Sequence, residues 1–154
     1  MSRHHKSQIF IIVLLFLTVS ACSSNSDEQQ ASQADVIRVI DGDTIVIAGD
    51  ERVRPIGIDT PEKGQCGFEE AKQALEKLLA SGPATFYSGT TSDKDKYGRL
   101  LRYIEVDGID VGLNLISNGF AIARYDSRDG YGPHDRESEY ITADENSTAA
   151  VKCD

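Results

Sequence analysis

Three short stretches of the sequence carry charged and hydroxyl side chains where apolar segments are interrupted. Residues 41–44 read Asp-Gly-Asp-Thr, residues 52–62 hold two arginines followed by Asp-Thr-Pro-Glu, and residues 93–99 read Asp-Lys-Asp-Lys-Tyr-Gly-Arg. Carboxylate and hydroxyl oxygens are the ligands that hard cations prefer. The forked donors of arginine match the oxygens of a phosphate group. Together these groups provide what phosphoryl transfer requires.

Each stretch alone has a simpler interpretation. Asp-Gly is a common hairpin turn, Thr-Pro-Glu is a common entry into a helix, and alternating Lys and Asp are typical of a solvated loop. The sequence has no paired His or Cys set with the spacing of a zinc site. The chemistry therefore depends on whether the three stretches meet in the fold.

A β-rich region that could bring them together begins at residue 35. Runs of β-branched residues at 36–40, 44–47 and 52–58 are separated by Asp-Gly and Gly-Asp turn signals, which predicts three successive strands. Further strands are expected at 84–89 and 100–106.

The clearest helix is expected over residues 68–81, where apolar residues fall on one face and Gly-Pro follows. A short helix is expected over 111–116, ended by Gly119, and a third over 133–146. The expected fold class is mainly β with helices (α+β), with five short strands forming a small closed or partly open barrel. The order of elements alone also allows an α+β sandwich.

Taken in series, the three stretches closely resemble the staphylococcal nuclease (thermonuclease) family. The likeness covers roughly residues 35–125, in order and spacing, and is looser beyond. It implies a five-stranded OB-fold barrel with about three α-helices. The implied activity is that of a calcium-dependent endonuclease, which hydrolyses DNA and/or RNA with little sequence preference and leaves 3′-phosphate ends.

The resemblance also implies a metal site and a base. By position, Asp43 and Asp59 match carboxylate ligands of Ca²⁺, and Thr60 matches a ligand through its backbone carbonyl. Glu62 falls where the family's proposed general base lies, the group that positions or deprotonates the attacking water.

The same resemblance implies which groups contact the substrate. Arg54 and Arg99 match the two arginines that hold the scissile phosphate and stabilise its developing charge. Lys96, Tyr97 and Tyr125 match the lysine and tyrosines that lie near the nucleotide.

The N-terminal residues have the pattern of an exported lipoprotein. Basic residues at 3–6 precede an apolar run over 9–17, about half of the roughly twenty residues that span a bilayer, which is typical of a signal peptide over residues 1–21. The run ends Val-Ser-Ala-Cys, which resembles a bacterial lipoprotein processing box and implies lipidation of Cys22; ordinary secretion is the alternative. Residues 22–34 are polar and predict a flexible tether, which leaves 35–154 as the folded domain.

The odd number of cysteines agrees with lipidation of one of them. The chain has three cysteines, Cys22, Cys66 and Cys153. If the first is lipidated, the other two remain and can form a disulfide in an oxidising environment.

The composition restricts how the protein can attract nucleic acid. The formal net charge is -9, from 25 acidic and 16 basic residues, which excludes binding through a basic overall field. Any nucleic-acid substrate must be held by local cationic groups and a bound metal. We expect a monomer anchored to the cell membrane and facing outward. A non-catalytic OB-type nucleic-acid-binding module and a calcium-binding surface lipoprotein remain alternatives.

Overall fold

The computed structural model of the 154-residue chain describes residues 30–89 and 92–150. The strands are β1 (Ala31–Gln33), β2 (Val36–Asp41), β3 (Thr44–Ile47), β4 (Glu51–Pro55), β5 (Ile58–Asp59), β6 (Ala84–Ser88), β7 (Leu100–Val106), β8 (Ile109–Asp110) and β9 (Ile122–Ala123). The helices are α1 (Phe68–Leu79), α2 (Val111–Ser117) and α3 (Glu137–Asn146), with a 3₁₀ turn at Ser127–Asp129.

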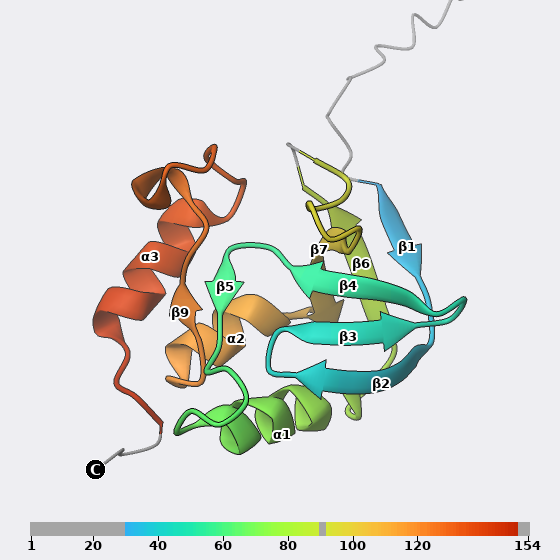
Figure 1. The fold of residues 1–154 in the computed structure, drawn as a ribbon, viewed down its shortest axis with the longest axis horizontal. Helices are drawn as coiled ribbons and strands as arrows, with labels where there is room; N and C mark the ends of the chain where they lie inside the picture. The colour runs from blue at the N-terminus through green and yellow to red at the C-terminus, as the bar shows by residue number, and fades with distance from the viewer. Residues whose placement is uncertain (1–29, 90–91, 151–154) are drawn as a thin grey trace, which may run out of the picture.

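The main sheet runs in the order β1-β6-β7-β4-β3-β2, with β8 paired to β7. The β4–β7 pair is parallel and the other pairs are antiparallel. The two end strands, β1 and β2, are consecutive in the chain and separated only by residues 34–35. The segment from 31 to 41 therefore joins both ends of the sheet and curls it into a barrel of the OB type (Figure 1).

The ordered domain begins earlier than the sequence predicts. Residues 31–33 were expected in the flexible tether, but they pair with β6 in the register Ala31↔Tyr87 to Gln33↔Thr85. Their side chains are exposed, so no apolar pattern could reveal this strand. The backbone hydrogen bonds that hold it come from β6, a partner far along the chain.

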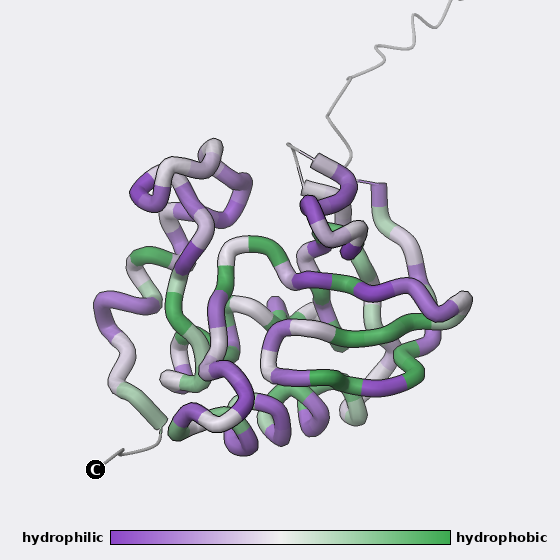
Figure 2. The backbone as a smooth tube through the Cα atoms, viewed as in Figure 1, coloured by the Kyte–Doolittle hydropathy of each residue, from purple (hydrophilic) through white to green (hydrophobic). Residues whose placement is uncertain are grey.

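In β3 and β4 the barrel core is built by alternation of inward-facing and outward-facing residues. Ile45 and Ile47 of β3 and Val53 of β4 point into the core, where they meet Leu75 of α1 and Leu115 of α2. Figure 2 shows the apolar residues concentrated in the strands and helices rather than in the connecting loops. The expected mixed fold is therefore confirmed, and the buried face of each of these two helices fixes its place on the barrel.

The strand expected over residues 52–58 is wrong as a single element. β4 ends at Pro55, which has no N–H for a continued ladder, and Gly57 then adopts a φ of 77°. The chain turns there into β5, which pairs with β9 in a separate two-stranded sheet. This break carries Asp59 away from the barrel wall and toward the opposite side of the site.

The helices differ from expectation mainly at their ends. α3 begins at Glu137 rather than at Pro133, because residues 133–136 form a turn whose His134 carbonyl accepts the Glu137 N–H. α1 ends at Leu79, two residues before the predicted end. No helix within the described residues has the length and apolar character needed to cross a membrane.

Candidate active site

The first carboxylate of the site is Asp43, at the turn between β2 and β3. Its side chain is buried, and Oδ2 accepts hydrogen bonds from the Thr60 N–H at 2.8 Å and the Thr60 hydroxyl at 2.9 Å. The turn lies so close to its neighbours that a Cβ on Gly42 would lie 2.8 Å from Thr60 Oγ1 and 2.9 Å from Ala71 Cβ. Glycine at this position therefore lets the turn pack against α1 and the segment after β5.

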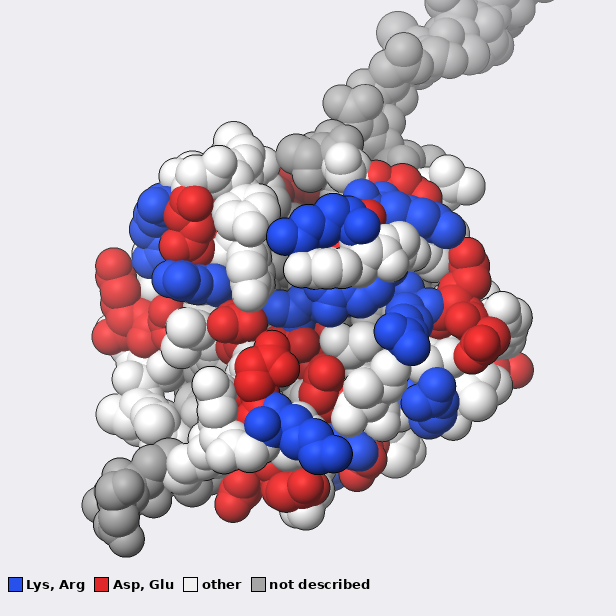
Figure 3. Space-filling view, viewed as in Figure 1, with Lys and Arg blue, Asp and Glu red and all other residues white. Residues whose placement is uncertain are grey.

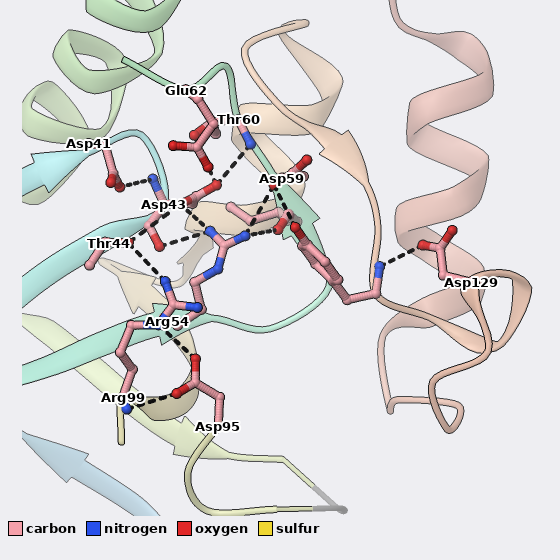
Figure 4. A network of polar contacts seen from close by, with 12 residues as sticks. Asp41, Asp43, Thr44, Arg54, Asp59, Thr60, Glu62, Asp95, Arg99 and Asp129 are labelled. Carbon is pink, nitrogen blue, oxygen red and sulfur yellow. Dashed lines mark hydrogen bonds and ion pairs between the residues drawn. The ribbon is translucent and has the colours of Figure 1, made fainter. Parts of the chain in front are cut away.

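Arg54 of β4 joins the two sides of the site (Figure 4). Its guanidinium forms an ion pair with Asp43 Oδ1 and another with Asp59 Oδ1 at 3.2 Å. It also donates to the carbonyls of Asp43 at 3.0 Å and Ile58 at 3.1 Å. Burial and the nearby Arg99 charge lower the pKa of Arg54, while Asp59 opposes that shift. Arg54 therefore holds two carboxylates from different segments, Asp43 in the β2–β3 turn and Asp59 on β5.

Arg99, which precedes β7, is oriented by a single carboxylate. Asp95 Oδ2 accepts from Arg99 Nε at 2.6 Å, and Asp95 Oδ1 accepts from the Arg99 backbone N–H at 2.9 Å. Burial opposes ionisation of Asp95, but these hydrogen bonds, with one from the Tyr97 backbone, outweigh it and lower the pKa of that carboxyl. The Arg99 guanidinium also reaches Thr44 Oγ1 at 3.5 Å. Figure 4 shows it on the same side of the site as Arg54.

Two tyrosines border the arginines. Tyr125 donates its hydroxyl to Asp59 Oδ1 at 3.1 Å, and its ring centroid lies 5.4 Å from the Arg54 guanidinium. Burial and the Asp59 charge raise the pKa of Tyr125. Tyr97 is 72% exposed, with the guanidinium of Arg99 5.4 Å and the ammonium of Lys96 5.0 Å from its ring centroid. An exposed ring flanked by cations is a surface on which a nucleobase can stack.

The donor set suits a hard cation only in part. Asp43 and Asp59 converge from opposite sides on Arg54. No group of three or more His, Cys, Asp or Glu side chains with metal-binding proximity occurs in residues 30–89 and 92–150. Two carboxylates with a backbone carbonyl leave most of the six to eight oxygen ligands of Ca²⁺ to water or substrate phosphate. The oxygen chemistry therefore fits a hard cation that is shared with the substrate.

Glu62 lies in the loop between β5 and α1 and is exposed. Its backbone N–H donates to Gln65 Oε1 at 2.7 Å, and its carbonyl accepts from the Gln65 N–H at 2.8 Å, which holds the loop. Figure 4 shows the side chain extending to the same side of the site as Asp43 and Thr60. Its carboxylate is thus accessible to water beside the other acidic groups.

A family model described as staphylococcal nuclease homologue matches residues 52–150. The chain belongs to the staphylococcal nuclease family. It is 32% identical over 139 residues to the thermonuclease of Staphylococcus intermedius, and the aligned region covers 83% of this chain and 80% of that protein. It is 29% identical over 158 residues to the thermonuclease of Staphylococcus hyicus, covering 94% and 88%. It is also 32% identical over 124 residues to endonuclease YncB of Bacillus subtilis, covering 75% of this chain and 57% of that protein.

Membership of the staphylococcal nuclease family confirms the resemblance and the predicted class of enzyme, a nuclease hydrolase. Within that family fold, the three stretches of the sequence do meet. Asp43, Arg54 and Asp59 form one contact network, which Tyr125 joins from the segment after β9. Thr60 bonds to Asp43, while Glu62 lies nearby without a hydrogen bond to this network among the described residues.

One residue of the site was missed by the sequence reasoning. Asp95 was noted only as part of a charged stretch, yet it holds both the backbone and the side chain of Arg99. The signal was its position four residues before Arg99, with Gly98 (φ 79°) closing a tight turn between them. Cys66, one half of the predicted disulfide, lies exposed in the loop after β5. Its predicted partner Cys153 and the predicted lipidation site Cys22 lie outside the described residues.

Proposed function

We propose that this protein is an exported, calcium-dependent nuclease that hydrolyses DNA and/or RNA phosphodiesters with little sequence preference and leaves 3′-phosphate ends. The observation that carries the proposal is the convergence of Arg54 and Arg99 beside Asp43 and Asp59. Two guanidiniums beside two carboxylates complement a phosphodiester and the cation that would accompany it.

The arginines act on the reacting phosphate. A phosphodiester is already negative, and attack by water adds charge to its oxygens as phosphorus becomes five-coordinate. Arg54 and Arg99 present forked donors from β4 and from the start of β7, so the two can hold different oxygens of one phosphate. Asp95 keeps the Arg99 side chain in place before substrate arrives, which avoids the entropic cost of ordering it.

Asp43, Asp59 and the backbone carbonyl of Thr60 would hold the calcium ion. When bound, the ion supplies positive charge that polarises the phosphate and orients water. Arg54 now occupies the space between the two carboxylates, so substrate binding must draw its guanidinium from carboxylate oxygens toward phosphate oxygens. Tyr125 contributes by holding Asp59 from the other side.

Glu62 is the proposed base. It stands on the loop after β5, exposed and beside Asp43 and Thr60, where it can accept a proton from an attacking water or orient that water by a hydrogen bond. Lys96 and Tyr97 face solvent next to Arg99 and would contact the nucleotide that follows the scissile phosphate or precedes it.

The test uses residues 23–154, incubated with single-stranded DNA and with RNA in calcium, magnesium or a chelator. We expect cleavage with calcium, and a fall of about a hundredfold or more in kcat for Arg99→Ala, the size seen when one charge-stabilising donor is removed. Lys77→Ala, an exposed residue at the end of α1, is the matched control for loss of one cation. Absence of calcium-dependent cleavage would overturn the proposal, and binding without cleavage would favour a silent OB-type module.

The location of the enzyme is a further part of the proposal. A signal peptide over residues 1–21 would direct export, and a lipid on Cys22 would anchor a monomer to the cell membrane with its domain facing outward. Labelled fatty acid should enter the wild-type protein and not Cys22→Ser, which should be released. Label in both, or in neither, would refute the anchor.

A disulfide between Cys66 and Cys153 completes the proposed exported form. Gln65, the neighbour of Cys66, lines a cavity of about 450 Å³ together with Ala149, which supports a path of the C-terminal segment past this loop. Thiol titration of denatured, unreduced residues 23–154 should find no free thiol. Two free thiols would contradict the pairing.

A further inference from the structure

The outer face of the sheet formed by β2, β3 and β4, opposite the core, carries two arginines that the catalytic proposal does not use. Arg38 and Arg52 are both exposed and both pair in register with Val46, which lies between them on β3. Residues directly opposite on neighbouring strands project to the same face, so these three side chains form one row.

Val46 indicates how the row packs. Ile45 and Ile47 belong to the core, whereas Val46 points the other way and is not part of the core cluster. It is nevertheless only 1% exposed. We attribute this burial to the aliphatic stems of Arg38 and Arg52, which flank it and leave their guanidiniums in solvent.

These two arginines differ from the others in their partners. Among residues 30–89 and 92–150, neither Arg38 nor Arg52 forms an ion pair with a carboxylate. Every other described arginine does: Arg54, Arg99, Arg102, Arg124, Arg128 and Arg136. In a chain of net charge -9, two guanidiniums that flank Val46 on one face, without an ion-pair partner among the described residues, form a local cationic surface.

The surface is continuous with the active site. Arg52 and Arg54 are two residues apart on β4 and therefore project to the same face, about 7 Å apart along the strand. Arg38 stands two strand spacings from Arg52, about 10 Å across β3. Figure 3 shows Lys and Arg gathered in a band over β4, with a separate cationic group over β2 and acidic residues beside them.

We infer that Arg38 and Arg52 form an arginine track that binds the phosphates of a nucleic-acid strand next to the scissile phosphate. This inference rests on the proposed nuclease function and deepens it, since it predicts that the enzyme engages more than the nucleotides at the cut. A polymer with one phosphate per nucleotide matches a row of cations that leads away from Arg54. The same cations could instead contact anionic lipid headgroups, and the experiment separates that outcome.

The experiment compares residues 23–154, which contain every residue of the folded core, with Arg38→Gln/Arg52→Gln. The control is Lys72→Gln/Lys77→Gln, which removes the same charge from α1. Binding of an oligothymidylate longer than roughly 16 nucleotides, the upper end of OB-fold site sizes, is measured in chelator at several salt concentrations. Cleavage of that oligonucleotide and of a dinucleotide is then measured in calcium.

The track variant should bind the oligonucleotide about tenfold more weakly, with a salt slope smaller by about 1.4, since each lost single-strand contact removes about 0.7. Its KM for the oligonucleotide should rise while kcat stays near that of the lysine control. The dinucleotide is too short to reach the track, so both variants should cleave it at similar rates.

Equal affinity and salt slope in the track variant and the lysine control would overturn the inference. Loss of binding to phosphatidylglycerol vesicles, with unchanged oligonucleotide binding, would overturn it in favour of a membrane contact. If the wild type cleaves nothing, the proposed function fails, while the binding data in chelator still decide whether the track holds nucleic acid.

Discussion

Arg54 is both a candidate phosphate ligand and the group that keeps Asp43 and Asp59 together. Its side chain is 8% exposed, and that of Asp43 is 7% exposed. Charges this deeply buried are tolerated only when paired and hydrogen-bonded. The structural role of Arg54 and its proposed catalytic role thus cannot be separated by mutation, whereas the proposed role of Arg99 can be tested without loss of a buried pair.

Arg54→Ala should destabilise the fold as well as abolish cleavage. Its loss leaves two carboxylates without their cation, and breaking a buried pair in this way costs about 3–5 kcal/mol. Urea unfolding without calcium should show this loss, with a much smaller one for Arg99→Ala. Calcium should restore stability more in Arg54→Ala than in Arg99→Ala if the two carboxylates hold the ion. Equal stability of the two variants without calcium would contradict the role of Arg54.

Asp95→Asn tests whether the Arg99 side chain must be held in place by Asp95 before substrate binds. Asparagine can still accept the backbone N–H of Arg99, but it removes the charge that pairs with the guanidinium. Misplacement of a catalytic group by about 1 Å can cost on the order of a hundredfold. We expect kcat to fall by about ten- to a hundredfold with little change in unfolding midpoint. Asp93→Asn, whose partner is Arg102, is the control.

At the scale of elements, the junctions between helices and strands restrict the sequence. Gly119 ends α2 with a φ of 72°, and its carbonyl accepts the Ala150 N–H at 3.0 Å. A Cβ there would lie 1.8 Å from the Thr148 carbonyl oxygen. The sequence predicted Gly119 as a helix stop, but the docking of the C-terminal segment on it was not predictable.

Gly119→Ala should therefore cost more than backbone strain alone. Gly108→Ala is the matched control, since Gly108 has a φ of 77° and nothing within 4 Å of a built Cβ. We expect the free energy of unfolding to fall by about 1 kcal/mol for the control and by about 2 kcal/mol or more for Gly119→Ala. Equal losses in denaturant unfolding would show that the segment after α3 simply moves aside.

The packing of the turn before α3 on the barrel predicts a pH dependence. His134 bonds through Nδ1 to the Tyr103 hydroxyl at 3.0 Å, and its Nε2 is buried without a hydrogen-bond partner among the described residues. Burial lowers the pKa of His134, against the smaller opposing influence of Glu137 and Asp126. The folded protein therefore holds this imidazole neutral.

Stability should fall as the pH drops below about 6.5, the ordinary pKa of histidine. The unfolded chain takes up the proton there, while the folded chain takes it up only at lower pH, so protonation favours unfolding. His134→Gln should reduce this fall, measured by urea unfolding between about pH 8 and pH 5. An identical pH profile in wild type and variant would assign the dependence to other groups.

At the scale of the whole molecule, closure of the barrel depends on the segment from 31 to 41. β1 supplies three residues of pairing to β6 before the chain passes to β2. The fold therefore begins inside the predicted tether, which leaves fewer residues between the proposed anchor at Cys22 and the barrel than the sequence suggested.

Shortening the chain from the N-terminus tests this closure. Chains that begin at residue 23 and at residue 30 should unfold at the same urea concentration. A chain that begins at residue 35 lacks β1 and should be less stable by about 1–3 kcal/mol, since it loses several backbone hydrogen bonds of about 1 kcal/mol each, partly offset by ordering entropy. Equal stability of all three chains would show that β1 contributes nothing.

The sequence by itself determined the family, the class of enzyme and most of the elements. Alternation places Ile45, Ile47 and Val53 in a core, and the three charged stretches identify the family and its groups. Only the tertiary structure decided that Arg54 joins two carboxylates, that Asp95 holds Arg99, and that Arg38 and Arg52 lie on either side of Val46. These contacts depend on strand register and on segments far apart in the chain. Local patterns record which face a residue occupies, but not which distant side chain it meets there.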